Sequence, residues 1–373
     1  MMKSDATGLY VHIPFCLKKC NYCDFCSFSG VGTAERAAYI DALRREIYGY
    51  RGRGIRADTV FFGGGTPSLL SPDEFLSVTE ALYQSFDIQP GAEFTVEMNP
   101  KTETRERLAA YRSAGVNRIS IGLQSIHKNE LKKLGRIHSY DDFLRALDGV
   151  HSVVTDNVSA DIMYGIPEQT AESFEETLRT VVTLGLTHIS AYGLIIEEGT
   201  RFFRERDTLS TPDEEAERAM YFSAIGILGE YGFSHYEISN YAMPGYECRH
   251  NLHYWHDDDY IGLGAAAYSC YDGVRFGNTA ILADYVDGKL RSGDREIIDA
   301  ATQAFEFAML RLRLSEGFSL TGYREKFGKE FAHGKEERIS LFSKLGLLRI
   351  SGDRIALTDE GMYVSNNIMA ELL

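Results

Sequence analysis

The chain has 373 residues, of which 44% are hydrophobic and 25% are charged, a composition typical of a folded protein and unlike that of a disordered chain. Acidic residues exceed basic ones, 54 against 39, so nucleic acid and anionic membrane surfaces are poor partners. The sequence has no apolar run long enough to cross a membrane, and no signal-peptide core precedes Leu9. We therefore expect a cytoplasmic protein without a transmembrane segment.

The first two thirds of the sequence alternate between strand-like and helix-like segments. Strands are predicted at residues 9–13, 59–62, 93–98, 118–123, 158–163, 188–194 and 235–238. Amphipathic helices are predicted at residues 35–50, 72–85, 103–114, 140–150, 171–184 and 212–231. This alternation is typical of β-α-β units, and the repeats suffice for an α/β fold with a full or partial (β/α) barrel. The functional loops of such barrels follow the carboxyl ends of the strands.

The last part of the chain has a different pattern. Helices are predicted at residues 299–313, 335–345 and 359–372, and a short hairpin at residues 347–350 and 354–357. Helices with a small hairpin indicate a mostly helical, winged-helix-like domain. We divide the chain into a barrel at residues 1–240, a connecting region packed on it at residues 241–298, and this domain at residues 299–373. Because the chain is acidic, the last domain is expected to pack on protein and not on nucleic acid.

Four of the six cysteines lie close together after the first predicted strand. Cys16, Cys20 and Cys23 have the spacing CxxxCxxC, and Cys26 follows them. Thiolates crowded into a loop in a reducing compartment indicate a metal site. Three of them could hold a cubane iron–sulfur cluster and leave one iron open to a small molecule. A zinc site is the alternative, with His12 or Cys26 as the fourth ligand.

Glycines and polar side chains follow several of the predicted strands. Residues 63–67, after the second strand, read GGGTP, and a backbone without side chains could admit the amino group of a ligand there. The polar side chains at later strand ends, or in the loops after them, are Glu97, Gln124, Ser125, Arg136 and Asp161. These are more polar groups than the stability of a barrel requires, so a binding site is predicted at this end of the sheet.

Residues 10–16 read YVHIPFC and lead into the CxxxCxxC spacing. This segment resembles the radical S-adenosylmethionine (SAM) proteins and, among them, the oxygen-independent coproporphyrinogen III dehydrogenase family with its heme chaperone branch. The resemblance extends over nearly the whole chain. It implies a partial barrel of the radical SAM type followed by a largely helical domain, in agreement with the patterns above. It also implies a [4Fe–4S] cluster on Cys16, Cys20 and Cys23, without Cys26.

The resemblance further implies which residues bind SAM. The GGGTP segment matches a SAM-contacting turn, and four later polar residues match the Glu, Gln, Arg and Asp that contact SAM in the family. Two tyrosines match aromatic positions beside the cluster, and one isoleucine matches a position at the adenine ring. The SAM-binding residues so expected are Tyr10, Tyr22, Gly64, Gly65, Thr66, Glu97, Gln124, Arg136, Asp161 and Ile195. No catalytic residue is assigned.

Two activities occur among these relatives, porphyrinogen decarboxylation and heme delivery, and the residues favour heme delivery. The dehydrogenase has a further cysteine two residues after the third cluster cysteine, where this chain has Phe25. It also has a long N-terminal arm, whereas only residues 1–8 precede the first predicted strand here. Residues 250–255 read HNLHYW and resemble the HNxxYW motif of the heme chaperones.

The resemblance makes His250 a candidate axial ligand of heme, and imidazole binds heme iron well. The alternative interpretation of this segment is a structural cap on the barrel. Tyr268 stands where the heme chaperones more often have histidine, which removes one possible ligand. Cys248 stands where they more often have serine, which adds another.

We therefore expect a SAM-binding [4Fe–4S] protein that binds heme as cargo and delivers it to acceptor proteins. The acceptors expected are respiratory or membrane proteins, so the protein could be peripheral at a membrane through its partner. Oxidative decarboxylation, the activity of an oxygen-independent coproporphyrinogen III dehydrogenase, is the first alternative. A zinc-stabilised binding module is the second.

Overall fold

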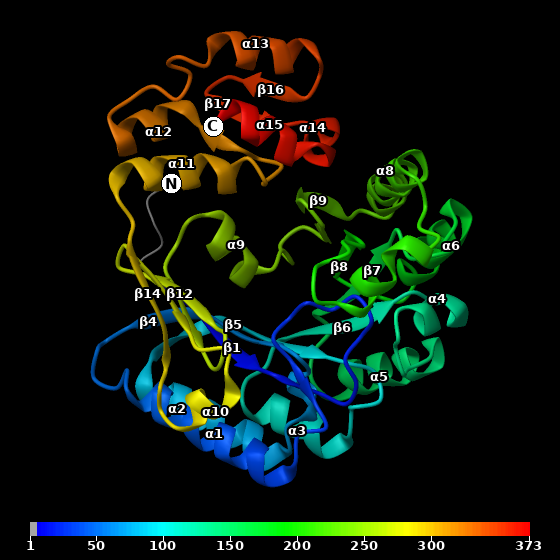
Figure 1. The fold of residues 1–373 in the computed structure, drawn as a ribbon, viewed down its shortest axis with the longest axis vertical. Helices are drawn as coiled ribbons and strands as arrows, with labels where there is room; N and C mark the ends of the chain where they lie inside the picture. The colour runs from blue at the N-terminus through cyan, green and yellow to red at the C-terminus, as the bar shows by residue number, and fades with distance from the viewer. Residues whose placement is uncertain (1–5) are drawn as a thin grey trace.

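The computed structural model describes residues 6–373, apart from the side chains of residues 292 and 294. A 12-stranded sheet curves through the larger part of the molecule (Figure 1). Its central strands run parallel to one another. In spatial order they are β11 (Tyr260–Leu263), β1 (Thr7–Ile13), β4 (Arg56–Gly64), β5 (Asp87–Met98), β6 (Arg118–Gln124), β7 (Val158–Tyr164) and β8 (His188–Gly193). The predicted partial barrel and its parallel sheet are confirmed.

Antiparallel strands extend this sheet at both edges. Beyond β11 lie β12 (Tyr268–Tyr271), β13 (Val274–Asn278) and β14 (Arg291–Ile297), and beyond β8 lie β10 (Asn240–Ala242) and β9 (Ser234–Glu237). The last strand predicted for the barrel is β9, which is not a further parallel repeat. It turns directly into β10, and β10 pairs antiparallel with β8. A short turn between two strands can join them only in the antiparallel sense.

Helices cover the outer face of the sheet. The long ones are α1 (Thr33–Tyr48), α2 (Pro72–Ser85), α3 (Arg105–Ser113), α5 (Tyr140–Val153), α6 (Ala171–Val181) and α8 (Glu214–Glu230). Short helices lie in the connecting segments: α4 (Lys128–Lys133), α7 (Arg201–Glu205), α10 (Leu282–Val286) and α9 (Arg249–Trp255), with 3-10 turns at Pro67–Leu69 and Arg206–Thr208. Helix α9 is not on the outer face, because it packs against β1 and β4 on the side of the C-terminal part. Several helices begin with a capping residue. In α2, Ser71 is the N-cap, its hydroxyl accepts the N–H of Glu74, and Pro72 occupies the first helical position.

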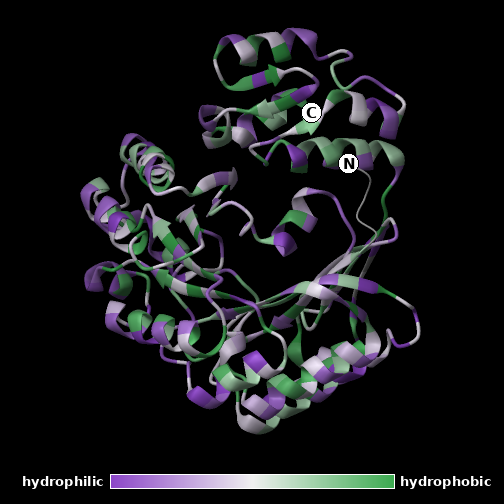
Figure 2. Ribbon diagram, turned by 180° about the vertical axis from the view of Figure 1, so that it is seen from behind, coloured by the Kyte–Doolittle hydropathy of each residue, from purple (hydrophilic) through white to green (hydrophobic). Residues whose placement is uncertain are grey.

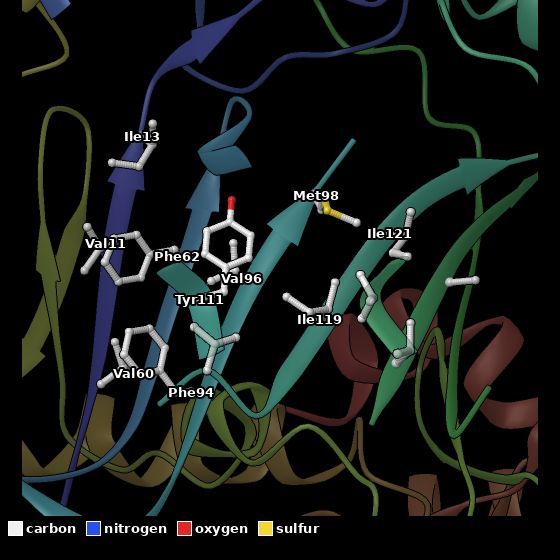
Figure 3. Close-up of a cluster of buried hydrophobic side chains, with 14 of the residues drawn as sticks. Val11, Ile13, Val60, Phe62, Phe94, Val96, Met98, Tyr111, Ile119 and Ile121 are labelled. Atoms are coloured by element: carbon white, nitrogen blue, oxygen red, sulfur yellow. The ribbon is translucent and has the colours of Figure 1, made fainter. Parts of the chain in front are cut away.

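Alternation along the strands separates a hydrophobic face from a polar one. Val60 and Phe62 of β4 lie beside Phe94 and Val96 of β5 in the buried layer (Figure 3). This layer packs on the helices, since the rings of Phe62 and Phe75 of α2 are 5.0 Å apart. Because successive side chains of a strand point to opposite faces, the residues between them point into the barrel. Figure 2 shows hydrophobic colour along the strands and mixed colour on the outer helices.

The C-terminal part has its own hydrophobic core. Its elements are α11 (Ala300–Arg311), β15 (Phe318–Ser319), α12 (Leu320–Phe327), α13 (Glu336–Lys344), β16 (Leu348–Ser351), β17 (Arg354–Leu357), α14 (Asp359–Tyr363) and α15 (Ser365–Leu372). The strands form a small sheet in the order β15-β17-β16. The predicted helices and hairpin are present, but α12 and β15 were not predicted. The last predicted helix is divided at Val364, whose φ of −107° and ψ of 24° are not helical.

The C-terminal part docks on α9, which lies between it and the sheet (Figure 1). The Arg311 guanidinium donates to the carbonyl of His256, directly after α9, at 3.3 Å. The N–H of Ser315 donates to the carbonyl of Tyr236 in β9 at 3.0 Å. The division into three parts stays a prediction. The strands of residues 260–297 belong to the same sheet as the barrel.

Candidate functional site

The cysteine loop begins where β1 ends. A two-stranded parallel sheet of β2 (Phe15–Cys16) and β3 (Phe28–Ser29) closes the loop. The N–H of Phe28 donates to the carbonyl of Pro14 at 2.7 Å and fixes the base of this closure. Cys16, Cys20 and Cys23 all line one cavity of about 360 Å³. The loop therefore brings the three thiols of the CxxxCxxC spacing to a common space.

Cys26 lies outside that cavity. Its thiol is 3.7 Å from the carbonyl oxygen of Ala280, and its own carbonyl oxygen is 2.9 Å from Nε2 of His12. Nδ1 of the same imidazole is 3.0 Å from the hydroxyl of Tyr10. The two candidate fourth ligands of a zinc site are thus engaged elsewhere. Within residues 6–373 no group of three or more His, Cys, Asp or Glu side chains could hold a metal ion.

The chemistry of the three thiols fits a cubane cluster, which binds cysteines at separate corners and so needs them around a cavity. The guanidinium of Arg136 is 3.6 Å from the sulfur of Cys20, and the hydroxyl of Thr66 is 3.6 Å from the sulfur of Cys16. Donors at this position stabilise a thiolate. Burial raises the pKa of the Cys23 thiol to about 11, so metal loading has to displace its proton.

The glycine-rich turn after β4 packs against the first strand. Gly64 has a φ of 110°, which glycine adopts without strain. A Cβ at this position would lie 2.5 Å from the ring of His12. The N–H of Gly65 donates to the carbonyl of Ile13 at 2.8 Å. Gly64, Gly65 and Thr66 line the cavity, and the two glycines also permit the close approach of β1 and β4.

Two carboxyl groups lie in the wall of the cavity. Glu97 of β5 accepts the N–H of Gly64 at 3.2 Å, and Asp161 of β7 accepts the hydroxyl of Ser120 at 2.9 Å. Burial, with repulsion from Asp161, raises the pKa of Glu97 to about 8. Burial also raises the pKa of Asp161. A bound cation would relieve both effects, so this wall favours a positively charged ligand.

Arg136 connects the cysteine loop to the strand ends. One nitrogen of its guanidinium donates to the side-chain oxygen of Asn99 at 2.7 Å and to the carbonyl of Gly122 at 2.6 Å. The amide nitrogen of Asn99 donates in turn to the hydroxyl of Thr66 at 2.9 Å. The side chain of Arg136 therefore connects its own segment with those of Cys20, Asn99 and Gly122, which are distant from one another in sequence.

Tyr192 of β8 closes the opposite wall. Its hydroxyl donates to the side-chain oxygen of Gln124 at 2.6 Å, and it also hydrogen-bonds the Tyr22 hydroxyl. Gln124 itself ends β6 with a φ of 72°, a left-handed conformation that turns its side chain at a register shift. Tyr192 and Asn99 are site residues that sequence reasoning missed. The period of two residues along a strand could have identified them. Tyr192 lies two residues after Ser190, Asn99 lies two residues after Glu97, and both of these side chains point into the barrel.

Of the SAM-binding residues expected from the sequence, all but one line this cavity. Ile195 lies at its rim with 69% of its surface exposed. Tyr10 is not a lining residue, because its side chain points into the closed barrel interior. Its ring lies 6.2 Å from that of Phe61 and 6.3 Å from that of His250. A direct contact of Tyr10 with the ligand of this cavity therefore finds no support in the geometry.

The two candidate heme ligands lie at the other end of the barrel interior, at the start of α9. Cys248 is fully buried, with its sulfur 3.6 Å from a carboxyl oxygen of Glu93. The other carboxyl oxygen of Glu93 accepts the N–H of Arg249 at 3.0 Å. Burial raises the pKa of the Cys248 thiol to about 12, so the group stays a neutral thiol. Unlike Cys23, whose thiol faces the open cavity, the Cys248 sulfur is enclosed, so a ligand cannot reach it in this conformation.

His250 is 1% exposed, and both of its ring nitrogens have partners. Nδ1 is 2.8 Å from the hydroxyl of Thr59, and Nε2 is 2.9 Å from the hydroxyl of Tyr254. Burial lowers the pKa of the imidazole to about 3. Neither nitrogen is open to a heme iron in this conformation. This geometry agrees with the alternative interpretation of the segment, a structural cap on the barrel, and His250 as a heme ligand stays a prediction.

Comparison with known proteins defines the class first. The profile of the radical SAM superfamily matches residues 10–181, and that of the HemN C-terminal domain matches residues 298–364. The fold is similar to that of coproporphyrinogen III oxidase (HemN) from Escherichia coli, a radical SAM enzyme, with a TM-score of 0.85. The two chains are 22% identical, and the match covers 100% of this chain and 91% of that one. The protein has the radical SAM fold.

Relatives that are similar over all or most of their length show the family to which the chain belongs. Heme chaperone HemW of Lactococcus lactis subsp. lactis is 32% identical, over 100% of this chain and 98% of the relative. Heme chaperone HemW of Bacillus subtilis is 32% identical, over 98% of each chain. Heme chaperone HemW of Escherichia coli is 36% identical, over 85% of each chain. The chain belongs to the family of the heme chaperone HemW.

Membership of the radical SAM superfamily implies a [4Fe–4S] cluster and SAM binding. The cavity described above has a thiol set that fits the cluster and two carboxyls that fit a cationic ligand such as the sulfonium of SAM. In the described part of the chain, no helix is long and apolar enough to span a membrane.

Proposed function

We propose that the protein binds heme and delivers it to acceptor proteins. The observation that carries this proposal is the similarity, over 98% or more of both chains, to two relatives named heme chaperone HemW. Phe25 also supports it. This residue stands two positions after Cys23, where the dehydrogenase has a further cysteine. As part of the same proposal, we place the protein in the cytoplasm, with respiratory or membrane proteins as acceptors.

We assign the cluster to Cys16, Cys20 and Cys23. The assignment is supported by the cavity that they share and by the donors to two of their sulfurs. When bound, such a cluster supplies an open iron and an electron. Asn99 and Gly122 hold the guanidinium of Arg136 beside the sulfur of Cys20.

We assign SAM to the rest of the same cavity. A sulfonium or an ammonium group beside Glu97 and Asp161 would favour the ionised forms of these two carboxyls, and at a buried site the resulting attraction is strong. Tyr192 orients Gln124 through its hydroxyl, so the amide of Gln124 keeps one direction. Ile195 at the rim offers an apolar surface to an adenine ring.

Heme titration followed by transfer tests the proposal. Hemin is added to the cluster-loaded protein, binding is followed at the Soret band, and the complex is mixed with an apo-cytochrome that becomes spectroscopically distinct on loading. Saturable binding with transfer supports the proposal. Absence of binding, together with turnover of coproporphyrinogen III by the same preparation, would overturn it in favour of the dehydrogenase. Iron and sulfide analysis of that preparation separates both from a zinc module.

A further inference from the structure

Heme delivery requires a side chain that the iron of an incoming heme can reach. Among the histidines, only one is exposed to solvent. All ten histidines of the chain lie in the described residues, and His333 alone is exposed. The others are buried or half-buried, and His250 has partners on both ring nitrogens. His333 lies in the segment that joins α12 to α13, in a part of the chain that no expectation from the sequence singled out.

His333 lines a cavity of about 380 Å³ in the C-terminal part. The wall of this cavity is aromatic. The rings of Tyr323 and Phe331 meet edge to face with centroids 5.4 Å apart, and Phe331 is only 2% exposed. Phe305 of α11 lies at the open side with 46% of its surface exposed. An apolar wall with one exposed aromatic ring suits a flat, hydrophobic ligand.

Cationic side chains stand beside this apolar wall. Lys329 and Lys335 both line the cavity. The ammonium of Lys335 lies 5.4 Å from the centre of the Phe331 ring and donates to the carbonyl of Leu372 at 2.6 Å. Burial lowers the pKa of Lys335, and the charges of Lys329 and Arg338 lower it further. Carboxylates of a bound ligand would relieve this crowding of positive charge.

The one acidic side chain of the wall, Glu330, is already engaged. Its carboxylate forms an ion pair with Arg324 at 3.1 Å. The positively charged side chains of the wall are Lys329 and Lys335, of which Lys335 already donates to the carbonyl of Leu372; Leu373 also lines the cavity. An imidazole, aromatic side chains and two ammonium groups in one cavity match the three chemical parts of heme: its iron, its macrocycle and its two propionates.

We propose that heme binds in this cavity with the imidazole of His333 as an axial ligand of the iron. The macrocycle rests on the exposed ring of Phe305 at the open side of the cavity, and the propionates pair with Lys329 and Lys335. The inference rests on the proposed function, because it assigns the place where the cargo is held. An open cavity and a ligand on an exposed loop suit a cargo that has to leave again.

Hemin titration of the cluster-loaded, full-length protein tests this assignment in wild type, His333→Ala and Lys329→Ala/Lys335→Ala. We expect the Kd to rise at least about tenfold in His333→Ala, since loss even of a group that supports a metal ligand costs that much. We expect a smaller, salt-dependent rise in the double lysine variant. Lys344→Ala, an exposed lysine of α13 outside the cavity, and Tyr268→Phe should bind as wild type.

A second measurement needs no variant. Diethyl pyrocarbonate should carbethoxylate His333 in the wild-type protein, and bound hemin should protect it, as read by peptide mass spectrometry. Wild-type affinity in His333→Ala, or no protection of His333 by saturating hemin, would overturn the assignment while heme binding itself stands. A wild-type protein that binds no hemin at all would overturn the proposed function, and this assignment with it.

Discussion

The two ends of the barrel interior carry the same kinds of side chain and differ in access. At the carboxyl ends of the strands, Cys16 and Glu97 line an open cavity. At the amino ends, Cys248 and Glu93 are buried, with the thiol 3.6 Å from the carboxyl oxygen. A thiol and a carboxyl that satisfy each other have nothing left to offer a ligand. Residue type therefore identifies a binding site only where the side chain is accessible and its polar atoms are not already occupied by partners within the protein.

The placement of α9 causes this difference. The helix lies across the starts of β1 and β4, and Gly8 lets it come close, since a Cβ there would be 3.2 Å from His253 and 3.3 Å from His250. At the opposite end the chain leaves the parallel strands in loops, which is where barrels keep their functional groups. One end is thus closed by packing, and the other stays open to a cofactor.

The largest effect is expected from the cysteines. Replacing Cys16, Cys20 or Cys23 by Ala should abolish the cluster, because each supplies one corner ligand. Cys26→Ala should keep it, because that thiol lies against Ala280 outside the cavity. Iron and labile sulfide content with the charge-transfer absorbance measures both. A cluster lost in Cys26→Ala would show that the ligand set is wrong.

At the closed end the expected effect is on stability. His250→Ala removes a buried ring and leaves the hydroxyls of Thr59 and Tyr254 without their partner. The free energy of unfolding should fall by about 3 kcal/mol, as measured by urea denaturation. His333→Ala, at an exposed site, should change it by less than about 0.5 kcal/mol. Unchanged stability with lost heme affinity in His250→Ala would make His250 a ligand and reverse the comparison.

At the open end a smaller effect is expected from one hydroxyl. Tyr192→Phe removes the donor to Gln124 and leaves the ring in place. The Kd for SAM should rise about fivefold, the equivalent of one hydrogen bond of about 1 kcal/mol, in equilibrium dialysis with cluster-loaded protein. Tyr83→Phe is the matched control, because that hydroxyl bonds Ala114 on the outer helices. Equal losses in both variants would remove Tyr192 from the site.

The last prediction concerns the change of stability with pH. Burial and Asp161 raise the pKa of Glu97 from 4.5 to about 8, so the folded state holds this proton more tightly than the unfolded state does. The stability that this contributes is complete below pH 4.5 and is lost as the pH rises through about 8. Over this range the free energy of unfolding of the cluster-free protein should fall less in Glu97→Gln than in wild type.

Burial raises the pKa of Glu237 to about 7, which adds the same trend to both proteins. Parallel curves would contradict the shift at Glu97.

Much of the architecture could be predicted because its signals are local. The alternation of two along β4 and β5 and the helical period of the segments between them place strands and helices in order. The strand β11 was missed, although it pairs with β1 in the sheet. It follows α9 after a short loop and has no helix of its own behind it, so the rule of alternating units does not detect it.

The sequence by itself determined the parallel sheet, the order of its strands along the chain and the cysteine spacing, because these depend on periods and distances of a few residues. Only the tertiary structure decided which side chains stay open. The partners of His250 come from β4 and from the next turn of α9, and the partners of Arg136 come from β6 and the loop after β5. Whether a group is satisfied depends on which distant segments pack around it, and no local pattern in the chain encodes that.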